Sequence, residues 1–112
     1  MRILLDHKTP APLRYALEGH QVETAYEKGW AELTNGELLS VAASSGFDLL
    51  ITTDKVIRYQ QDLSGRKLSL LVLSTNDWTR IRSCKALVVA AIASMRDRSY
   101  LEVEIPLPRD IQ

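Results

Sequence analysis

The stretch LLITTDK, residues 49–55, decides the fold. Three large aliphatic residues followed by β-branched threonines predict a strand that is buried on both faces, as in the parallel sheets of α/β proteins. Asp54 comes at the carboxyl end of this strand, where open α/β sheets bind their ligands. Other polar residues that reach the same edge are therefore candidates for a common site.

Strand-like and helix-like segments alternate along the whole chain. We expect strands at 2–5, 20–24, 48–53, 68–73 and 100–105, and helices at 10–19, 35–46, 55–63 and 77–95. Asn35 is the expected N-cap of the second helix, and 25–34 is expected to be a loop with one helical turn. The last strand alternates aliphatic residues with glutamates before Pro106, which is typical of an edge strand. The alternation predicts a single domain, residues 1–112, with a three-layer α/β/α fold and a central, mostly parallel sheet of about five strands.

Composition narrows the class of protein. The chain has one cysteine, Cys84, so it forms no internal disulfide and suits a reducing compartment. One cysteine and two histidines are too few for a structural zinc site. The N-terminal segment lacks the apolar core of a signal peptide, and the longest apolar run, 86–93, is far shorter than a membrane span. We therefore expect a soluble, cytoplasmic protein.

The formal net charge is zero but it is unevenly distributed. Residues 1–54 hold four Lys/Arg and eight Asp/Glu, a net charge of −4, and residues 55–98 hold nine and three, a net charge of +6. One interpretation is an acidic metal pocket beside a basic rim that holds phosphate; the other is an ordinary solvated surface whose charges vary by chance.

Several carboxylates are expected at one edge of the sheet. Asp6 follows the first strand, Asp54 the third and Asp77 the fourth, while Glu37 lies in the first turn of the helix that leads into the third strand. Carboxylates gathered in this way repel one another unless a cation lies between them, and hard oxygen ligands favour Mg²⁺ or Mn²⁺. Such an ion activates water and binds a phosphodiester.

Each of these acids also has a purely structural interpretation. Asp6 could begin a turn, and Asp54 could cap the helix that follows it. Glu37 near a helix N-terminus complements the helix dipole, and Asp77 is better suited to capping the long helix than to binding a metal.

Three segments, MRILLDHKTPAPLRYAL, GWAELTNGELLSVAASSGFDLLITTDK and IRYQQDLSGRKLSLLVLSTNDW, resemble small bacterial PIN-like proteins over roughly residues 1–82. The resemblance implies an α/β nuclease fold and, as in many PIN domains, a metal-dependent ribonuclease, including the toxins of toxin–antitoxin pairs. The first acid of the family matches Asp6, the acid before the third strand matches Glu37, and the acid of the T-x-D motif matches Asp54.

The chain departs from the family at two positions. Val56 stands where many relatives have a further acid, and His7 stands where another acid is common. Three carboxylates are enough for one metal ion but not clearly for two. His7 is either a group near the metal, able to act as a general acid or base, or an ordinary surface histidine.

The hypothesis that follows is a Mg²⁺- or Mn²⁺-dependent endoribonuclease, with RNA as substrate and an antitoxin protein as a partner. Its catalytic and metal-binding residues would be Asp6, Glu37 and Asp54. Lys55, Arg58, Gln61 and Thr53 would contact the substrate, with His7 and Asp77 as accessory residues. In the alternative interpretation of 57–61, Tyr59 packs and its neighbours form a solvated helix face.

Two other functions remain open. A catalytically silent PIN-like scaffold that binds a protein partner or nucleic acid would explain Val56 and the zero net charge, and Trp30 or Trp78 could anchor its interface. A phosphoacceptor pocket like that of a receiver domain would need a lysine after the last strand, and the segment 104–107 has none. The edge strand at 100–105 or the apolar long helix could support a homodimer.

Overall fold

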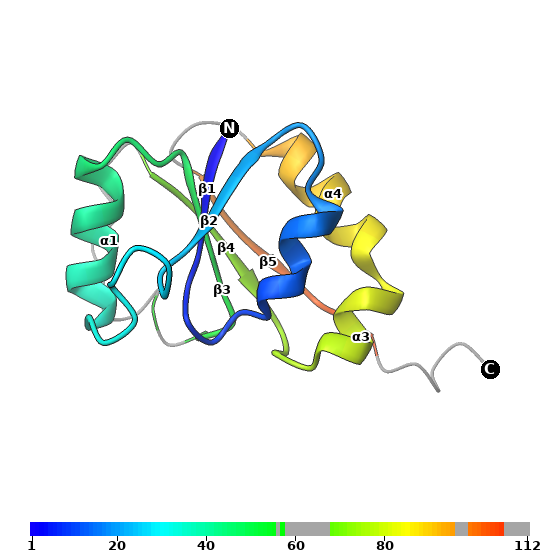
Figure 1. Ribbon diagram of the computed structural model, residues 1–112. Coiled ribbons are helices and arrows are strands. Elements are labelled where there is room, and N and C mark those ends of the chain that lie inside the picture. Colours follow the sequence, from blue (N-terminus) through cyan, green and yellow to red (C-terminus); the bar gives the residue numbers. More distant parts are fainter. Residues whose placement is uncertain (56, 58–67, 96–98, 107–112) are drawn as a thin grey trace.

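The computed structural model describes residues 1–55, 57, 68–95 and 99–106. Figure 1 shows strands and helices alternating along the chain. The strands are β1 (Arg2–Leu5), β2 (Gln21–Thr24), β3 (Leu49–Thr52), β4 (Ser69–Leu73) and β5 (Tyr100–Val103). The helices are the 3₁₀ helix η1 (Ala11–Ala16) and the α-helices α1 (Asn35–Ser44), α3 (Trp78–Ser83) and α4 (Lys85–Ser94).

The five strands form one sheet in the order β2-β1-β3-β4-β5, and every neighbouring pair is parallel. This confirms the predicted α/β fold with a central parallel sheet. In the register, Leu5 of β1 lies opposite Thr24 of β2 on one side and Ile51 of β3 on the other. All residues of β3 and β4 are buried, as expected for strands covered on both faces.

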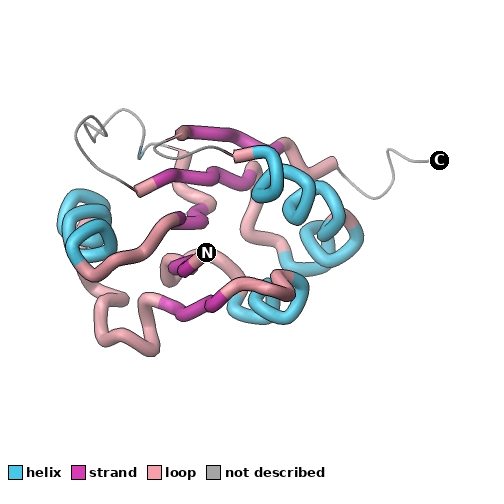
Figure 2. The backbone as a smooth tube through the Cα atoms, turned by 90° about the horizontal axis from the view of Figure 1, so that it is seen from above, coloured by secondary structure: helices cyan, strands magenta, loops and turns pink. Residues whose placement is uncertain are grey.

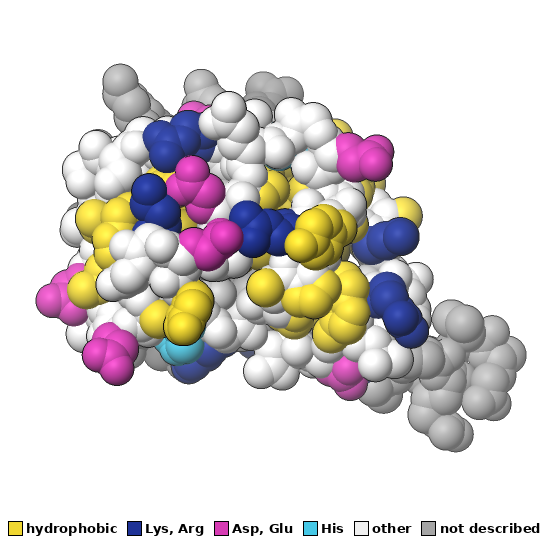
Figure 3. Space-filling view, in the orientation of Figure 1, with side chains coloured by type: hydrophobic (Ala, Val, Ile, Leu, Met, Phe, Trp, Pro, Cys, Tyr) yellow, Lys and Arg dark blue, Asp and Glu magenta, His cyan; other side chains and the backbone are white. Residues whose placement is uncertain are grey.

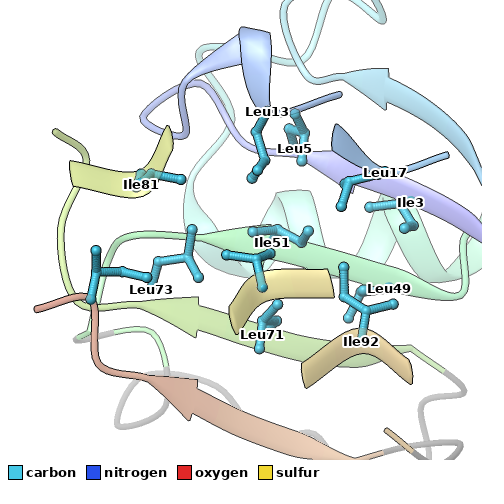
Figure 4. Packing of buried hydrophobic residues seen from close by; sticks show 12 residues of the cluster. Ile3, Leu5, Leu13, Leu17, Leu49, Ile51, Leu71, Leu73, Ile81 and Ile92 are labelled. Carbon is cyan, nitrogen blue, oxygen red and sulfur yellow. The ribbon is translucent and has the colours of Figure 1, made fainter. Parts of the chain in front are cut away.

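Helices cover both faces of the sheet and give three layers (Figure 2). Successive strand residues point to opposite faces, so each face has its own core. On one face Leu4 and Leu50 pack with residues of α1, including Leu39. On the other face lies the larger cluster shown in Figure 4, in which Leu5 and Ile51 pack with residues from η1, α3 and α4.

Local signals fix both ends of α1, and the N-terminal end differs by one residue from the sequence prediction. Thr34, not Asn35, is the N-cap: its hydroxyl accepts a hydrogen bond from the Glu37 N–H. Asn35 is the first residue of the helix. At the other end Gly46 adopts a φ of +85°, and the following Phe47 N–H bonds back to the Ala42 carbonyl. This C-terminal motif turns the chain toward β3.

Two predicted helices form differently. Residues 11–16 form a 3₁₀ helix rather than an α-helix: the N–H of Leu13 bonds to the carbonyl of Pro10 and the N–H of Leu17 bonds to that of Arg14, three residues back in each case. The expected long helix is two helices, α3 and α4, separated at Cys84, whose N–H bonds to Ile81 in a tighter i→i−3 turn. Just before the break, the Ser83 hydroxyl donates a hydrogen bond to the Thr79 carbonyl. The helix predicted at 55–63 lies largely outside the described residues.

The last strand lies where the sequence predicts it, at an edge of the sheet. Within and after β5, Glu102 and Glu104 are exposed, whereas Leu101 and Val103 are half-buried and Ile105 is buried. Charged residues on such an edge discourage pairing with other chains. Among the described residues no helix is both long and apolar enough to cross a membrane.

Candidate functional site

The strand order places one candidate site at the centre of the sheet. From β1 the chain crosses to β2 on one side, whereas from β3 it continues to β4 and β5 on the other. The order therefore reverses between β1 and β3, and open α/β sheets bind ligands at the carboxyl ends of strands at such a point. Asp6 follows β1 and Asp54 follows β3, so both reach this switch point, as the sequence predicts.

Asp6 is held by an extensive set of hydrogen bonds. Its side chain is buried, with 4% of the residue exposed. One carboxylate oxygen accepts bonds from the N–H of Thr9, at 2.9 Å, and from its hydroxyl, at 2.5 Å. The other accepts a bond of 2.6 Å from the hydroxyl of Thr52. Asp6 thus closes the turn 6–9 and also ties that turn to β3. The turn-forming role that the sequence suggested for Asp6 is therefore present in the structure.

Thr52 connects the two aspartates. Its side chain is completely buried, and its hydroxyl donates to Asp6 while its oxygen accepts a bond of 3.1 Å from the backbone N–H of Asp54. A hydroxyl can donate one bond and accept others, so this geometry uses both capacities. The ends of β1 and β3 are therefore joined by side chains as well as by the sheet, and we call Asp6, Thr9, Thr52 and Asp54 the switch-point network.

The carboxylate of Asp54 has two polar neighbours from other parts of the chain. Its Oδ2 accepts a hydrogen bond of 3.1 Å from the side-chain amide of Asn35 and lies 3.8 Å from the ammonium of Lys8. About 20% of the Asp54 side chain and 53% of the Lys8 side chain are exposed. Asp54 is thus the aspartate that solvent can reach, with a cation beside it.

Lys8 and Asn35 were not among the predicted site residues. The only signals that could have indicated them are a polar residue three positions after the first strand and another at the start of the helix before the third strand. Asn35 was instead interpreted as a helix cap. Its contact with Asp54 spans nineteen residues and depends on how α1 packs beside β3, which a local pattern does not encode.

Glu37 occupies a different environment. Its carboxylate accepts a bond of 2.9 Å from the N–H of Thr34, completing a reciprocal capping box at the start of α1. Its exposed side chain also lines a shallow hollow on the outer side of α1, together with Trp30 and Val41. The structural interpretation of Glu37 therefore accounts for its position.

The expected three-carboxylate cluster does not form. Among the described residues, which include Asp6, Glu37 and Asp54, no group of three or more His, Cys, Asp or Glu side chains is placed to hold a metal ion. The reason is local: the capping box engages the carboxylate of Glu37 at the helix N-terminus. Of the expected three acids, Asp6 contributes its carboxylate to the switch-point network and Asp54 joins the network through its backbone N–H.

The remaining predicted site residues are distributed as follows. Asp77 caps α3, accepting bonds from the N–H groups of Thr79 and Arg80, which is the structural role foreseen for it. His7 is exposed beside Asp6, and Thr53 is half-buried beside Thr52. Lys55 is exposed and lines a polar pocket of about 260 Å³ with Ser74, Glu102 and Glu104. Arg58, Gln61 and Val56 lie outside the described residues.

A second charged contact lies on the β2 side of the molecule. The guanidinium of Arg14 donates to the carboxylate of Glu27 at 3.0 Å and to the carbonyl of Val22 at 2.8 Å. Glu27 also accepts a bond from the backbone N–H of Thr24. The hydrogen bond from Arg14, followed by that from Thr24, lowers the pKa of Glu27 below its ordinary value. The hydrogen bond with Glu27 in turn raises the pKa of Arg14. This contact ties η1 to the turn after β2.

Fold and geometry together define the chain as an α/β protein with a five-stranded, all-parallel sheet and a polar network at its topological switch point. No protein-family model matches the chain, and neither a curated protein nor a solved structure shows a significant match to it. Its function therefore has to be inferred from the site itself.

Proposed function

We propose that the carboxyl edge of β1 and β3 is the active site of a PIN-like, Mg²⁺- or Mn²⁺-dependent ribonuclease that cleaves RNA phosphodiesters. The observation that carries the proposal is the double role of Thr52, which holds Asp6 and Asp54 in one hydrogen-bonded unit at the switch point. This is the place where an open parallel sheet presents a ligand site, and its side chains are hard oxygen donors.

The residues present fit one divalent ion bound largely by water and substrate. A carboxylate offers about four acceptor positions, and the bonds from Thr9 and Thr52 occupy three positions on Asp6. Magnesium commonly uses one or two carboxylates and completes its octahedron with waters and substrate phosphate. Asp6 and Asp54 would hold the ion, which when bound lowers the pKa of a coordinated water and stabilises charge on the phosphate.

The side chains around the aspartates supply positioning and charge. Thr9 and Thr52 fix the rotamer of Asp6, and Asn35 orients Asp54. Lys8 lies 3.8 Å from Asp54 with about half of its side chain exposed, so it would bind a phosphate oxygen of the substrate. His7, exposed and adjacent to Asp6, would exchange a proton with solvent or the leaving oxygen.

The test is cleavage of a labelled single-stranded RNA with Mn²⁺, with Mg²⁺ and with a chelator. The proposal expects metal-dependent cleavage that Asp54→Asn abolishes. Asp77→Asn is the matched control, because it makes the same carboxylate-to-amide change at a cap where asparagine serves as well. Metal-dependent cleavage that survives Asp54→Asn would overturn the assignment.

A toxin role adds a second readout. Expression of an active ribonuclease in a bacterial host should slow growth, and expression of Asp54→Asn should not. Co-expression of a protein that restores growth and co-purifies with the chain would identify an antitoxin. Equal growth with both forms would argue against the toxin role while leaving RNA cleavage to be judged by the assay above.

One observation favours the alternative, a catalytically silent scaffold that binds a protein partner or nucleic acid. Asp6 is almost wholly buried with most of its acceptor positions filled, and Glu37 serves as a helix cap, so both acids have structural roles. Titration calorimetry with Mn²⁺ separates the two functions. Heat of binding that Asp54→Asn removes supports the nuclease, and no binding at millimolar metal supports the scaffold.

A further inference from the structure

Helix α4 is unusual for a helix at the surface of a protein. Between Lys85 and Ser94 every residue is apolar, yet only Val88 and Ile92 are buried. Leu87 and Val89 are 46% and 44% exposed. A surface helix normally carries polar residues on the face that points away from the core. Val89 shares one side of α4 with Ala86, Ala90 and Ala93, whereas Leu87 lies on the opposite side of the buried Val88, and in the described part of the chain neither side is covered.

The exposed face of α4 forms a groove with η1. The groove has a volume of about 480 Å³, and Ala86, Val89, Ala90 and Ala93 line its α4 side. Tyr15, which is 80% exposed, lines it from η1. Figure 3 shows hydrophobic side chains gathered over η1 on this side of the molecule. The three alanines leave room for another helix to approach closely. We call this surface the α4 groove.

Opposite charges lie at the two ends of the α4 groove. Glu18 follows η1 and precedes β2, so it lies toward the amino edge of the sheet (Figure 1). α4 runs toward β5 and ends near that same amino edge, which places Lys85, its first residue, at the far end. Both side chains are exposed, and neither forms an ion pair with another described residue.

We propose that the α4 groove is an isologous interface between two copies of this chain. A two-fold axis perpendicular to α4 near Ala90 packs the two α4 helices antiparallel. It also reverses the groove end to end, so that Lys85 of each copy faces Glu18 of the other. A two-fold interface must be self-complementary, and a groove with an apolar centre and opposite charges at its ends meets that requirement.

This inference is independent of the ribonuclease proposal. The α4 groove is lined by η1 and α4, and no residue of the switch-point network takes part in it. Loss of the dimer and loss of RNA cleavage would therefore be separate results.

The experiment measures the oligomeric state of the full chain by sedimentation velocity and light scattering over a wide concentration range. The wild type should show a concentration-dependent dimer. Val89→Glu should give a monomer, because it places a charge at the centre of the apolar contact. Val89 is nearly half exposed, so circular dichroism should show an unchanged fold for this variant.

Charge reversal tests the register of the interface. Lys85→Glu alone and Glu18→Lys alone should each raise the dissociation constant by on the order of tenfold at low salt, since each like-charge contact occurs twice. The double variant should restore it, and Glu32→Lys, an exposed charge outside the groove, should leave it unchanged. A monomer at all concentrations, a dimer that Val89→Glu does not affect, or a double variant without recovery would each overturn the proposal.

Discussion

The hydroxyl of Thr52 donates a 2.6 Å hydrogen bond to the carboxylate of Asp6 across 46 residues of sequence. Both residues are buried, Thr52 completely. The bond joins the ends of two adjacent parallel strands at the place where the chain changes direction across the sheet. The stability of the central sheet and the geometry of the candidate site therefore depend on the same pair of side chains.

Thr52→Val should destabilise the protein by about 1–3 kcal/mol. The substitution keeps the shape of the side chain but leaves a buried oxygen of Asp6 without its donor. Urea unfolding followed by circular dichroism measures the change. Thr52→Ser, which keeps the hydroxyl, is the control, and its free energy of unfolding should fall much less. Equal stability of the valine variant and the wild type would mean that this bond contributes little.

Thr34→Ala should cost about 0.5–2 kcal/mol, because the helix N-terminus loses its side-chain cap. Glu37→Gln should be nearly neutral, since glutamine also completes a capping box. The same Glu37→Gln protein should cleave RNA as the wild type does. A large loss of activity without loss of stability would show that Glu37 binds the metal after all.

Lys8→Ala should raise KM for RNA severalfold with little change in kcat. Lys8 stands beside Asp54 and would contribute a phosphate contact rather than a chemical step. The slope of the logarithm of the RNA-binding constant against the logarithm of salt concentration should become shallower by about one, the contribution of one phosphate contact. Lys28→Ala is the matched control, because it removes the same charge from an ion pair with Glu23. An equal effect of both variants would indicate general electrostatic attraction only.

Acid should weaken the contact between Arg14 and Glu27. The pKa of Glu27 is lowered in the folded protein, so the contact stabilises the fold above the ordinary glutamate value of 4.5 and is lost as pH falls through the lower folded value. Glu27→Gln should make the melting temperature less dependent on pH below 4.5. Thermal melts at several acidic pH values check this, and Glu32→Gln, another exposed acid, serves as the control. Parallel curves for Glu27→Gln and the wild type would contradict the prediction.

The sequence predicts the sheet well because its strands are strongly marked. A continuous apolar run such as Leu49–Ile51 has few alternatives to a strand covered on both faces, and the alternation of segments implies parallel pairing. Helix details were harder. The cap belongs to Thr34 rather than its neighbour Asn35, and the break at Cys84 involves no glycine or proline that would have announced it.

The candidate site could be predicted only in part. Topology alone brings Asp6 and Asp54 to the same edge, because Asp6 follows β1, Asp54 follows β3, and these two parallel strands are neighbours in the sheet. Glu37 has the topological position expected of a site residue, but its carboxylate accepts a hydrogen bond from the backbone N–H of Thr34 and so caps the helix. The link through Thr52 depends on a side-chain rotamer in a packed interior, and no periodic pattern records it.

The all-parallel sheet also constrains how the chain acquires its structure. Among the five described strands no two neighbours are joined by a hairpin, so each of these pairings must close a long loop before it gains any stability. β1 cannot pair with β3 until more than forty further residues have been synthesised. During synthesis, therefore, the nascent chain carries the apolar residues of β1 exposed until β3 has formed, and it would be a substrate for chaperones during this interval.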